Sequence, residues 1–375
     1  MPNTNDTQLR RYATLAAIDT YVERTIITPR ERKVSNGDRY QWGEGDRYPL
    51  YLEDLYDNAT TLNSVIGGLT DYIAGDDVLF RGKRDEVLNR RGETAADLTR
   101  QAGDNLGKYG GVAFEIVRAK DGGIAETYVD NLKTIRTNKE NTTFWYSEKW
   151  GTSRPEPVTL PAFMPDIAQK WAGMTDEERK RHAVSILLIK MDAGRIYPVP
   201  PYAAAVRACE IERSIDDFHL SSLANGFAPS AIVSLLNGVP QDDEKAEIER
   251  NFYEKFTGSP NAARIMLNFA DDKEHAAVVE AIKTEDFGER YNALAKRASQ
   301  EIFTAFRAIP ALFGINPENN GFAEAEYAEA FKLFNRTQVR PRQRKIADAF
   351  ARIYGEPVLE IIPFSIESTG EAAVN

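Results

Sequence analysis

The sequence predicts an α+β fold in which two long helices bracket a small α/β insert. Apolar residues at helical spacing, with no Gly or Pro to break them, cover residues 203–223. A second pattern of apolar residues at helical spacing covers 286–307. Short apolar runs separated by turn signals occupy 230–281, between the two patterns. With 375 residues the chain can bury a sizeable core and form two or three structural units.

The first two hundred residues predict a mixed α/β domain. Helices are expected over residues 51–74, 95–109 and 175–181. Strands are expected over residues 112–118, 127–130, 142–150 and 184–190. The turn at Gly122 and Gly123 predicts that the first two of these strands form a hairpin.

The first long helix has both ends fixed by the sequence. Pro198, Pro200 and Pro201 restrict the backbone ahead of it, and Gly226 followed by Pro229 ends it. Its apolar residues recur near helical spacing, at Val206, Cys209, Ile215, Phe218 and Leu223. Its polar faces carry Arg207, Glu210, Glu212, Asp216 and Asp217. A helix with two fixed ends indicates a structural post more than a catalytic loop.

The second long helix, over 286–307, has a similar length. Its apolar side carries Leu294, Ala298, Ile302, Ala305 and Phe306, and its outer side carries Arg290, Lys296, Arg297 and Glu301. At a rise of ~1.5 Å per residue each helix is roughly 30 Å long, so the two can run antiparallel past one another. A plain helical hairpin with an inserted subdomain would have the same pattern.

The insert between the helices predicts a strand, a helix and two strands, over 230–236, 241–256, 263–269 and 276–281. A module of this size has little core of its own, so we expect it to pair with a neighbouring copy. The helix over 241–256 is acidic, with Asp242, Asp243, Glu244, Glu247, Glu249 and Glu254. A solvated helix face explains these charges equally well.

After the second helix comes a polar loop without Lys or Arg, which consists of Asn316, Pro317, Glu318, Asn319, Asn320 and Gly321. Its composition predicts an exposed segment. A helix is expected from Phe322, and it should be interrupted at Pro341, which lacks a backbone donor, before resuming as far as Gly355. Charge reverses along this helix, at Arg336, Arg340, Arg342, Arg344, Lys345 and Arg352. These residues are expected either to face a nucleic acid or, more consistently with an acidic chain, to pair with neighbouring subunits.

Composition excludes several classes of protein. The formal net charge of −10 argues against tight nucleic-acid binding, which needs Lys and Arg at the phosphates, but not against a conduit through which a duplex slides. No apolar run approaches the ~20 residues of a membrane span, and the polar N-terminus predicts no signal peptide. The single cysteine, Cys209, excludes an internal disulfide and is expected to be a core residue.

The search for catalytic chemistry is negative, so we expect no catalytic residues, no cofactor and no metal. The run from Gly103 to Tyr109 has one residue too few for a phosphate-binding loop and lacks its Ser or Thr, so a helix end is expected there. His182, His219 and His275 stand far apart, without ligand spacing. Trp145, Tyr146 and Trp150 are expected to pack in a core or an interface rather than to stack on bases.

The order of these segments resembles the portal proteins of tailed bacteriophages, the head-tail connectors. The resemblance covers about residues 52–355 and depends on the lead-in with Tyr197, Val199 and Pro200, the end with Asn225 and Gly226, the insert, the segment 306–314 and the break at Arg340 and Pro341. It implies a wing over 1–200, stem helices over 201–225 and 286–308, a clip over 226–285 and a tunnel loop over 309–321. Residues 322–375 would form a kinked C-terminal helix, a return to the wing and a reduced crown.

The resemblance also implies the function and the partners. A homo-oligomeric ring, twelve-fold as is usual in the family, would form a channel at one capsid vertex of the virion, assembled in the host cytoplasm, for packaging and ejecting double-stranded DNA without sequence specificity. Its other partners would be the large terminase subunit, the major capsid protein and a head-tail adaptor, with no membrane. DNA would pass nearest Asn316, Glu318, Asn319, Asn320 and Gly321; Asp242, Asp243, Glu244 and Glu247 in the clip would dock the motor. Stem residues would be Arg207, Glu210, Asp217, Arg290, Arg297 and Glu301.

Two other classes of protein remain open at this point. One is another virion structural protein, such as a capsid or adaptor subunit. The other is an α/β enzyme with a helical cap, which a pocket of converging ionisable groups with shifted pKa values would favour.

Overall fold

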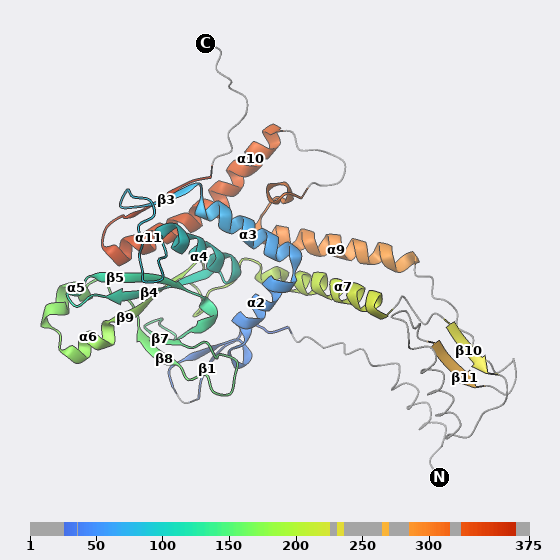
Figure 1. The fold of residues 1–375 in the computed structure, drawn as a ribbon, viewed down its shortest axis with the longest axis horizontal. Helices are drawn as coiled ribbons and strands as arrows, with labels where there is room; N and C mark the ends of the chain where they lie inside the picture. The colour runs from blue at the N-terminus through green and yellow to red at the C-terminus, as the bar shows by residue number, and fades with distance from the viewer. Residues whose placement is uncertain are drawn as a thin grey trace, which may run out of the picture.

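A computed structural model describes residues 26–35, 37–225, 231–235, 265–269, 285–315 and 324–364. Figure 1 shows a body of helices and small sheets from which two helices, α7 (Val206–Asn225) and α9 (Glu285–Phe306), extend side by side. At their far end lies a parallel pair of strands, β10 (Ala231–Leu235) and β11 (Ile265–Phe269). The α+β class and the two predicted long helices are confirmed.

The first strands of the described residues are a short antiparallel pair, β1 (Glu31–Lys33) and β2 (Tyr40–Trp42). The helix predicted over 51–74 was wrong in one respect, because it is two helices, α2 (Tyr48–Asn58) and α3 (Thr60–Ala74). Ala59 between them is extended, with φ −107° and ψ 107°. The apolar stripe continues through the break because Leu55, Ala59 and Leu62 are all buried.

The central sheet has the order β5-β4-β9 and is antiparallel throughout. Its strands are β4 (Gly111–Arg118), β5 (Ile124–Asp130) and β9 (Val184–Lys190), so the predicted hairpin is confirmed. Val112, Phe114 and Ile116 form one fully buried face of β4. Helix α4 (Ala95–Lys108) begins with a reciprocal capping box between Thr94 and Asp97, which satisfies two backbone donors at its first turn.

A second antiparallel sheet lies beside the first and contains β6 (Ile135–Thr137), β7 (Thr143–Tyr146) and β8 (Val158–Pro161). The strand predicted over 142–150 is therefore shorter than expected. Short helices are α5 (Ile167–Lys170) and α6 (Asp176–His182), with 3-10 turns at Glu44–Asp46, Leu132–Thr134 and Trp171–Gly173. Arg136, fully buried in β6, donates to Asp46 Oδ1 at 2.9 Å, and this buried ion pair ties the second sheet to the N-terminal segment.

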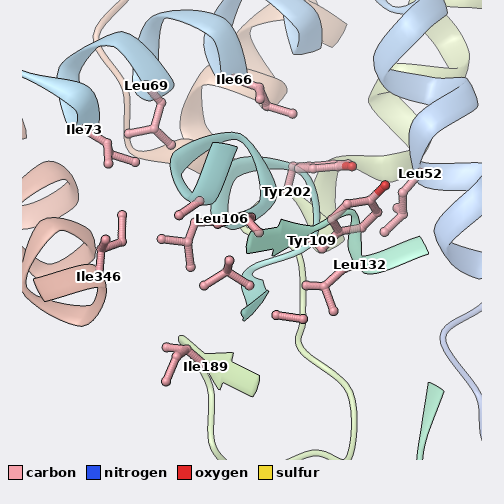
Figure 2. Packing of buried hydrophobic residues seen from close by; sticks show 14 of the residues in the cluster. Leu52, Ile66, Leu69, Ile73, Leu106, Tyr109, Leu132, Ile189, Tyr202 and Ile346 are labelled. Atoms are coloured by element: carbon pink, nitrogen blue, oxygen red, sulfur yellow. The ribbon is translucent and has the colours of Figure 1, made fainter. Parts of the chain in front are cut away.

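One contiguous hydrophobic core joins these layers. Figure 2 shows Ile66, Leu69 and Ile73 of α3 approaching Leu106 of α4, with Ile189 of β9 and Ile346 of α11 completing the cluster. Close approach of α3 and α4 depends on glycine: a Cβ at Gly107 would lie 2.9 Å from Ile66 Cγ2, and one at Gly103 would lie 3.2 Å from Ile73 Cγ2. The side chains of Ile66 and Ile73 on α3 therefore pack directly against the backbone of α4 at Gly107 and Gly103.

The C-terminal helix is bent rather than broken. Helix α10 (Glu324–Phe334) passes through one π-helical turn (Asn335–Val339) into α11 (Arg340–Tyr354), with Pro341 in the first turn of α11. The helix was predicted to be interrupted at Pro341, but the irregular π-helical turn lies a few residues earlier. Pro341 itself is in the first turn of α11, where its missing backbone N–H destabilises a helix least. Gly355, with φ 79°, ends α11 as expected.

A strand that the sequence pattern did not predict follows α11. Strand β12 (Leu359–Ile362) pairs antiparallel with β3 (Asp77–Phe80), so the chain returns to the N-terminal part of the body after residue 355. Among the described residues, no helix is long and apolar enough to cross a membrane.

Candidate functional site

The feature to which the sequence points is the pair of helices α7 and α9. They run antiparallel, as two ring contacts show: Tyr202 stacks on Phe306 at 5.6 Å near the body, and Phe218 stacks on Tyr291 at 4.8 Å farther out. These contacts are separated by sixteen residues along one segment and fifteen along the other, which corresponds to roughly 24 Å of helix. The pair is therefore aligned over most of its length.

The segment that leads into α7 is anchored to the body. Tyr197 is buried and stacks on Trp42, with ring centroids 4.7 Å apart and an interplanar angle of 8°. The carbonyl of Val199 lies against Gly110, where no side chain would fit, since a Cβ there would be 1.9 Å from the Val199 oxygen. The expectation that this segment fixes the start of the helix is supported by these contacts.

Glu212 links α7 to the first turn of α3. Helix α3 has Ala59 at its N-cap and so has no capping side chain of its own. Glu212 takes this role from the neighbouring helix: its carboxylate accepts from the Thr61 amide at 3.1 and 3.3 Å and from Thr61 Oγ1 at 2.7 Å. Thr61 Oγ1 also lies 3.2 Å from Ser299 Oγ of α9, so one residue of α3 contacts both long helices.

Replacing Glu212 with alanine is expected to reduce the free energy of unfolding by about 1–2 kcal/mol, because the Thr61 amide loses its acceptor and the helix its N-terminal negative charge. Chemical denaturation measures this loss. Glu212→Gln keeps an acceptor and should lose less than half as much. An equal loss in both variants would show that the charge, and not the cap, accounts for the effect.

Further polar contacts hold the base of α7. Arg213 makes a bidentate ion pair with Asp54 of α2, with Nη2 3.2 Å from Oδ1. Glu210 was expected on a polar face, but this was wrong, since it is buried. Cys209 is a buried free thiol, as expected, and burial raises its pKa to about 12, so it stays protonated.

The outer surface of the helix pair carries exposed apolar side chains. Phe218 was expected on the core side of α7 and Leu294 on that of α9, yet their side chains are 47% and 44% exposed. Leu220 is 65% exposed, and Ile211 is exposed as well. Helical periodicity placed Phe218 and Leu294 on the apolar sides of α7 and α9, but the part of the chain that the structure describes leaves all four side chains exposed. Such a surface is typical of an interaction site.

The remaining predicted stem residues are spread around the pair. Arg207 and Asp217 are exposed on α7, and Arg297 on α9 bonds to Glu301 at 2.9 Å, one turn later. The side chain of Arg290 lies outside the described residues, as do Asp242, Asp243, Glu244 and Glu247 of the insert and the loop residues Asn316, Glu318, Asn319, Asn320 and Gly321.

The segment after α9 is packed before the loop begins. A 3-10 turn, Pro310–Phe313, follows α9, and the Leu312 carbonyl accepts from Tyr72 Oη at 2.7 Å. Phe313 lies against Gly68 of α3, where a Cβ would be 2.6 Å from its ring. On the side of the body, both α7 and the segment after α9 are therefore in contact with α3. The sequence did not predict these contacts.

The described residues offer no group of acidic, His or Cys side chains that could hold a metal ion. The run that vaguely resembled a phosphate loop is the end of α4, where Tyr109 is fully buried, as its interpretation as a helix end predicted. Trp150 is buried and donates from Nε1 to the Thr134 carbonyl at 2.6 Å, consistent with core packing.

Basic residues of the C-terminal helix differ in exposure. Arg336, Arg340, Arg344, Lys345 and Arg352 are exposed, whereas Arg342 is buried, and burial together with nearby Arg307 lowers the pKa of its guanidinium to about 10. Arg342 donates to the Gln338 carbonyl at 2.5 Å. The surface charge of this helix is thus smaller than the six basic residues suggested.

Comparison with solved structures finds the same fold in gene transfer agent (GTA) particles. The chain is similar to one from "Virion of native gene transfer agent (GTA) particle", with 18% identity, 85% of this chain and 84% of that chain covered, and a TM-score of 0.54. A second, from "Neck of native GTA particle computed with C12 symmetry", shares 18% identity over 85% and 84% of the two chains, with a TM-score of 0.52.

No curated protein matches the chain. The family model described as "Phage portal protein" matches residues 89–361, which is most of the chain and includes the central sheet, both long helices and the bent C-terminal helix. This family is structural and non-enzymatic. The chain belongs to the phage portal protein family.

Proposed function

We propose that this chain is a portal subunit that forms a ring-shaped DNA channel at one vertex of a capsid. The observation that carries the proposal is the anchored helix pair α7/α9, whose outer surface leaves Phe218, Leu220 and Leu294 uncovered in a single copy. In a ring, each copy meets its neighbours through two different surfaces, and such contacts close by rotation. The exposed apolar side chains fit a contact of this kind.

The parts of the chain are assigned accordingly. The body up to residue 200 is the wing, α7 and α9 are the stem, and the insert between them is the clip, which docks the large terminase subunit and later the neck proteins. The stem surrounds the channel, and residues 316–321 come nearest to the duplex. A twelve-fold ring is favoured because a chain of similar fold occurs in the neck of a native GTA particle computed with C12 symmetry. Its location is the virion.

The charge of the chain suits a conduit. A net charge of −10 disfavours strong phosphate contacts, which would slow a sliding duplex. The loop at 316–321 contains no Lys or Arg, so its contact with DNA is steric or mediated by water. Packaging then depends on channel geometry and a separate motor, which consumes ATP in place of this chain.

Mass photometry and electron microscopy of the purified chain test the ring. Closed rings are expected at micromolar concentration, alone or with crowding agent or scaffold. A stable monomer or dimer under all these conditions would count decisively against a portal and favour an adaptor or another class of protein.

Deleting residues 316–321 is expected to leave ring assembly intact but to impair DNA packaging or retention at least tenfold. The reason is that α9 and the turn at Pro310–Phe313 are anchored to α3 independently of the loop. The readout is nuclease-protected DNA per particle, with rings counted in the same preparation. Loss of rings instead would show that this loop is part of the subunit interface.

A further inference from the structure

A small cationic pocket lies at the end of the body opposite to β10 and β11. Its walls come from the β4–β5 turn, the end of α11, the residue after β3, and α5 with the segment before it. Its volume is about 300 Å³, at the lower end of the range for ligand sites. Three arginines, Arg81, Arg118 and Arg352, line it, and none of the described residues that line it is acidic.

Arg118 is the distinctive member of this pocket. Its side chain is only 8% exposed, and it packs over the ring of Phe163 at 5.2 Å. Nη1 donates to the Gly122 carbonyl at 2.8 Å and Nη2 to the Met164 carbonyl at 3.0 Å. These neutral oxygens occupy two of five donors. Among the described residues no carboxylate forms an ion pair with Arg118, although a buried charge ordinarily has a charged partner.

The other two arginines are accessible at the mouth of the pocket. Arg352 is exposed near the end of α11. Arg81 lies 3.3 Å from Glu356, but both side chains are more than half exposed, so this pair is weak and can exchange for another carboxylate. Tyr354 forms part of the wall, with the Arg81 guanidinium 5.7 Å from its ring centroid. Planar guanidinium groups recognise carboxylates through paired hydrogen bonds.

We infer that the Arg118 pocket binds an acidic peptide segment of another protein that contacts the wing. A carboxylate fits because it supplies the negatively charged partner that the Arg118 guanidinium lacks among the described residues. The pocket is large enough for one or two side chains but too small for a duplex. This inference rests on the proposed function for its choice of partner: with the stem around the channel, the opposite end of the body lies at the rim of the ring. That end is far from both the DNA and the stem contacts.

Fluorescence anisotropy with a labelled hexaglutamate peptide tests the pocket on the full-length chain at low salt. Arg352→Gln is expected to weaken binding at least fivefold. Its matched control is Arg344→Gln, an exposed arginine two turns earlier on α11 that does not line the pocket, and binding there should be unchanged. Arg118→Lys keeps the charge but loses the planar fork, and should weaken binding as Arg352→Gln does.

Several results would overturn the inference. Equal weakening by Arg352→Gln and Arg344→Gln would mean that overall charge attracts the peptide, and equal binding of hexaglutamine would mean that charge is irrelevant. Displacement of hexaglutamate by a short duplex DNA at lower concentration than by unlabelled peptide would point to nucleic acid. Counting rings in the same samples distinguishes this inference from the proposed function. Peptide binding that depends on the pocket, without rings, would support the pocket and contradict the proposed ring-forming portal subunit. Rings without such binding would support the portal subunit and contradict the pocket.

Discussion

Replacing Gly110 with alanine is expected to lower the free energy of unfolding by more than about 4 kcal/mol, a loss that few single substitutions cause. Gly110 has φ +75°, and its added Cβ would lie 1.9 Å from the Val199 carbonyl oxygen. Neither group can turn aside, because Gly110 follows the end of α4 and Val199 lies between Pro198 and Pro200. The lead-in to α7 must therefore move away from the body.

Gly92→Ala is the matched control for this substitution. Gly92 has nearly the same φ, +78°, but no atom lies within 4 Å of the position that its Cβ would take. Its cost is that of a left-handed alanine alone, about 1–2 kcal/mol. Denaturant titrations of both variants separate backbone strain from collision. If the two lose the same stability, the close approach of Val199 to Gly110 is not what holds the stem segment.

The lead-in also shows what could be predicted from the sequence. Proline fixes φ wherever it occurs, so Pro198, Pro200 and Pro201 alone predicted a rigid start for α7. The surface against which that segment packs could not be predicted, because Trp42 and Gly110 are distant from it in sequence and contact it only in the folded chain. The sequence thus predicts the local backbone restraint from proline, but not which distant residues the restrained segment contacts.

The same limit explains the errors. Strand β12 was missed because its stability comes from pairing with β3, almost three hundred residues earlier, and a four-residue run carries little local signal. The break at Ala59 was missed because the apolar stripe stays in phase across it and neither Gly nor Pro marks it. Glu212 was assigned to a polar face, and nothing local could show that it caps α3.

Among the proposed stem residues, Phe218 shows where periodicity stops being informative. Its spacing with Val206, Cys209 and Ile215 predicted an apolar stripe, and the first three are buried in one copy. Phe218 lies farther out, beyond the body, where only Tyr291 and His219 touch its ring among the described contacts. Helical periodicity predicts that an apolar side chain is buried in a contact, but it does not predict whether that contact is made within one copy of the chain or with another copy.

Leu220→Glu is accordingly expected to abolish ring assembly while leaving the subunit folded. The side chain is 65% exposed, so its replacement should change the free energy of unfolding by no more than about 0.5 kcal/mol. At a subunit contact the same change would forfeit about 2 kcal/mol of apolar burial and place an unpaired carboxylate in an apolar interface. A closed ring repeats this loss at every contact, so even a modest cost per interface disfavours the whole ring.

Val158→Glu on β8 is the control, since Val158 is 58% exposed and lies on the body, away from α7 and α9 (Figure 1). It introduces the same charge at similar exposure and should leave ring assembly intact. Mass photometry across a concentration series compares the fraction of subunits in rings, and thermal melting checks that both variants fold. Rings of Leu220→Glu at the wild-type concentration, or equal loss in Val158→Glu, would mean that the exposed surface of the stem is not where subunits meet, and that these side chains contact another partner instead.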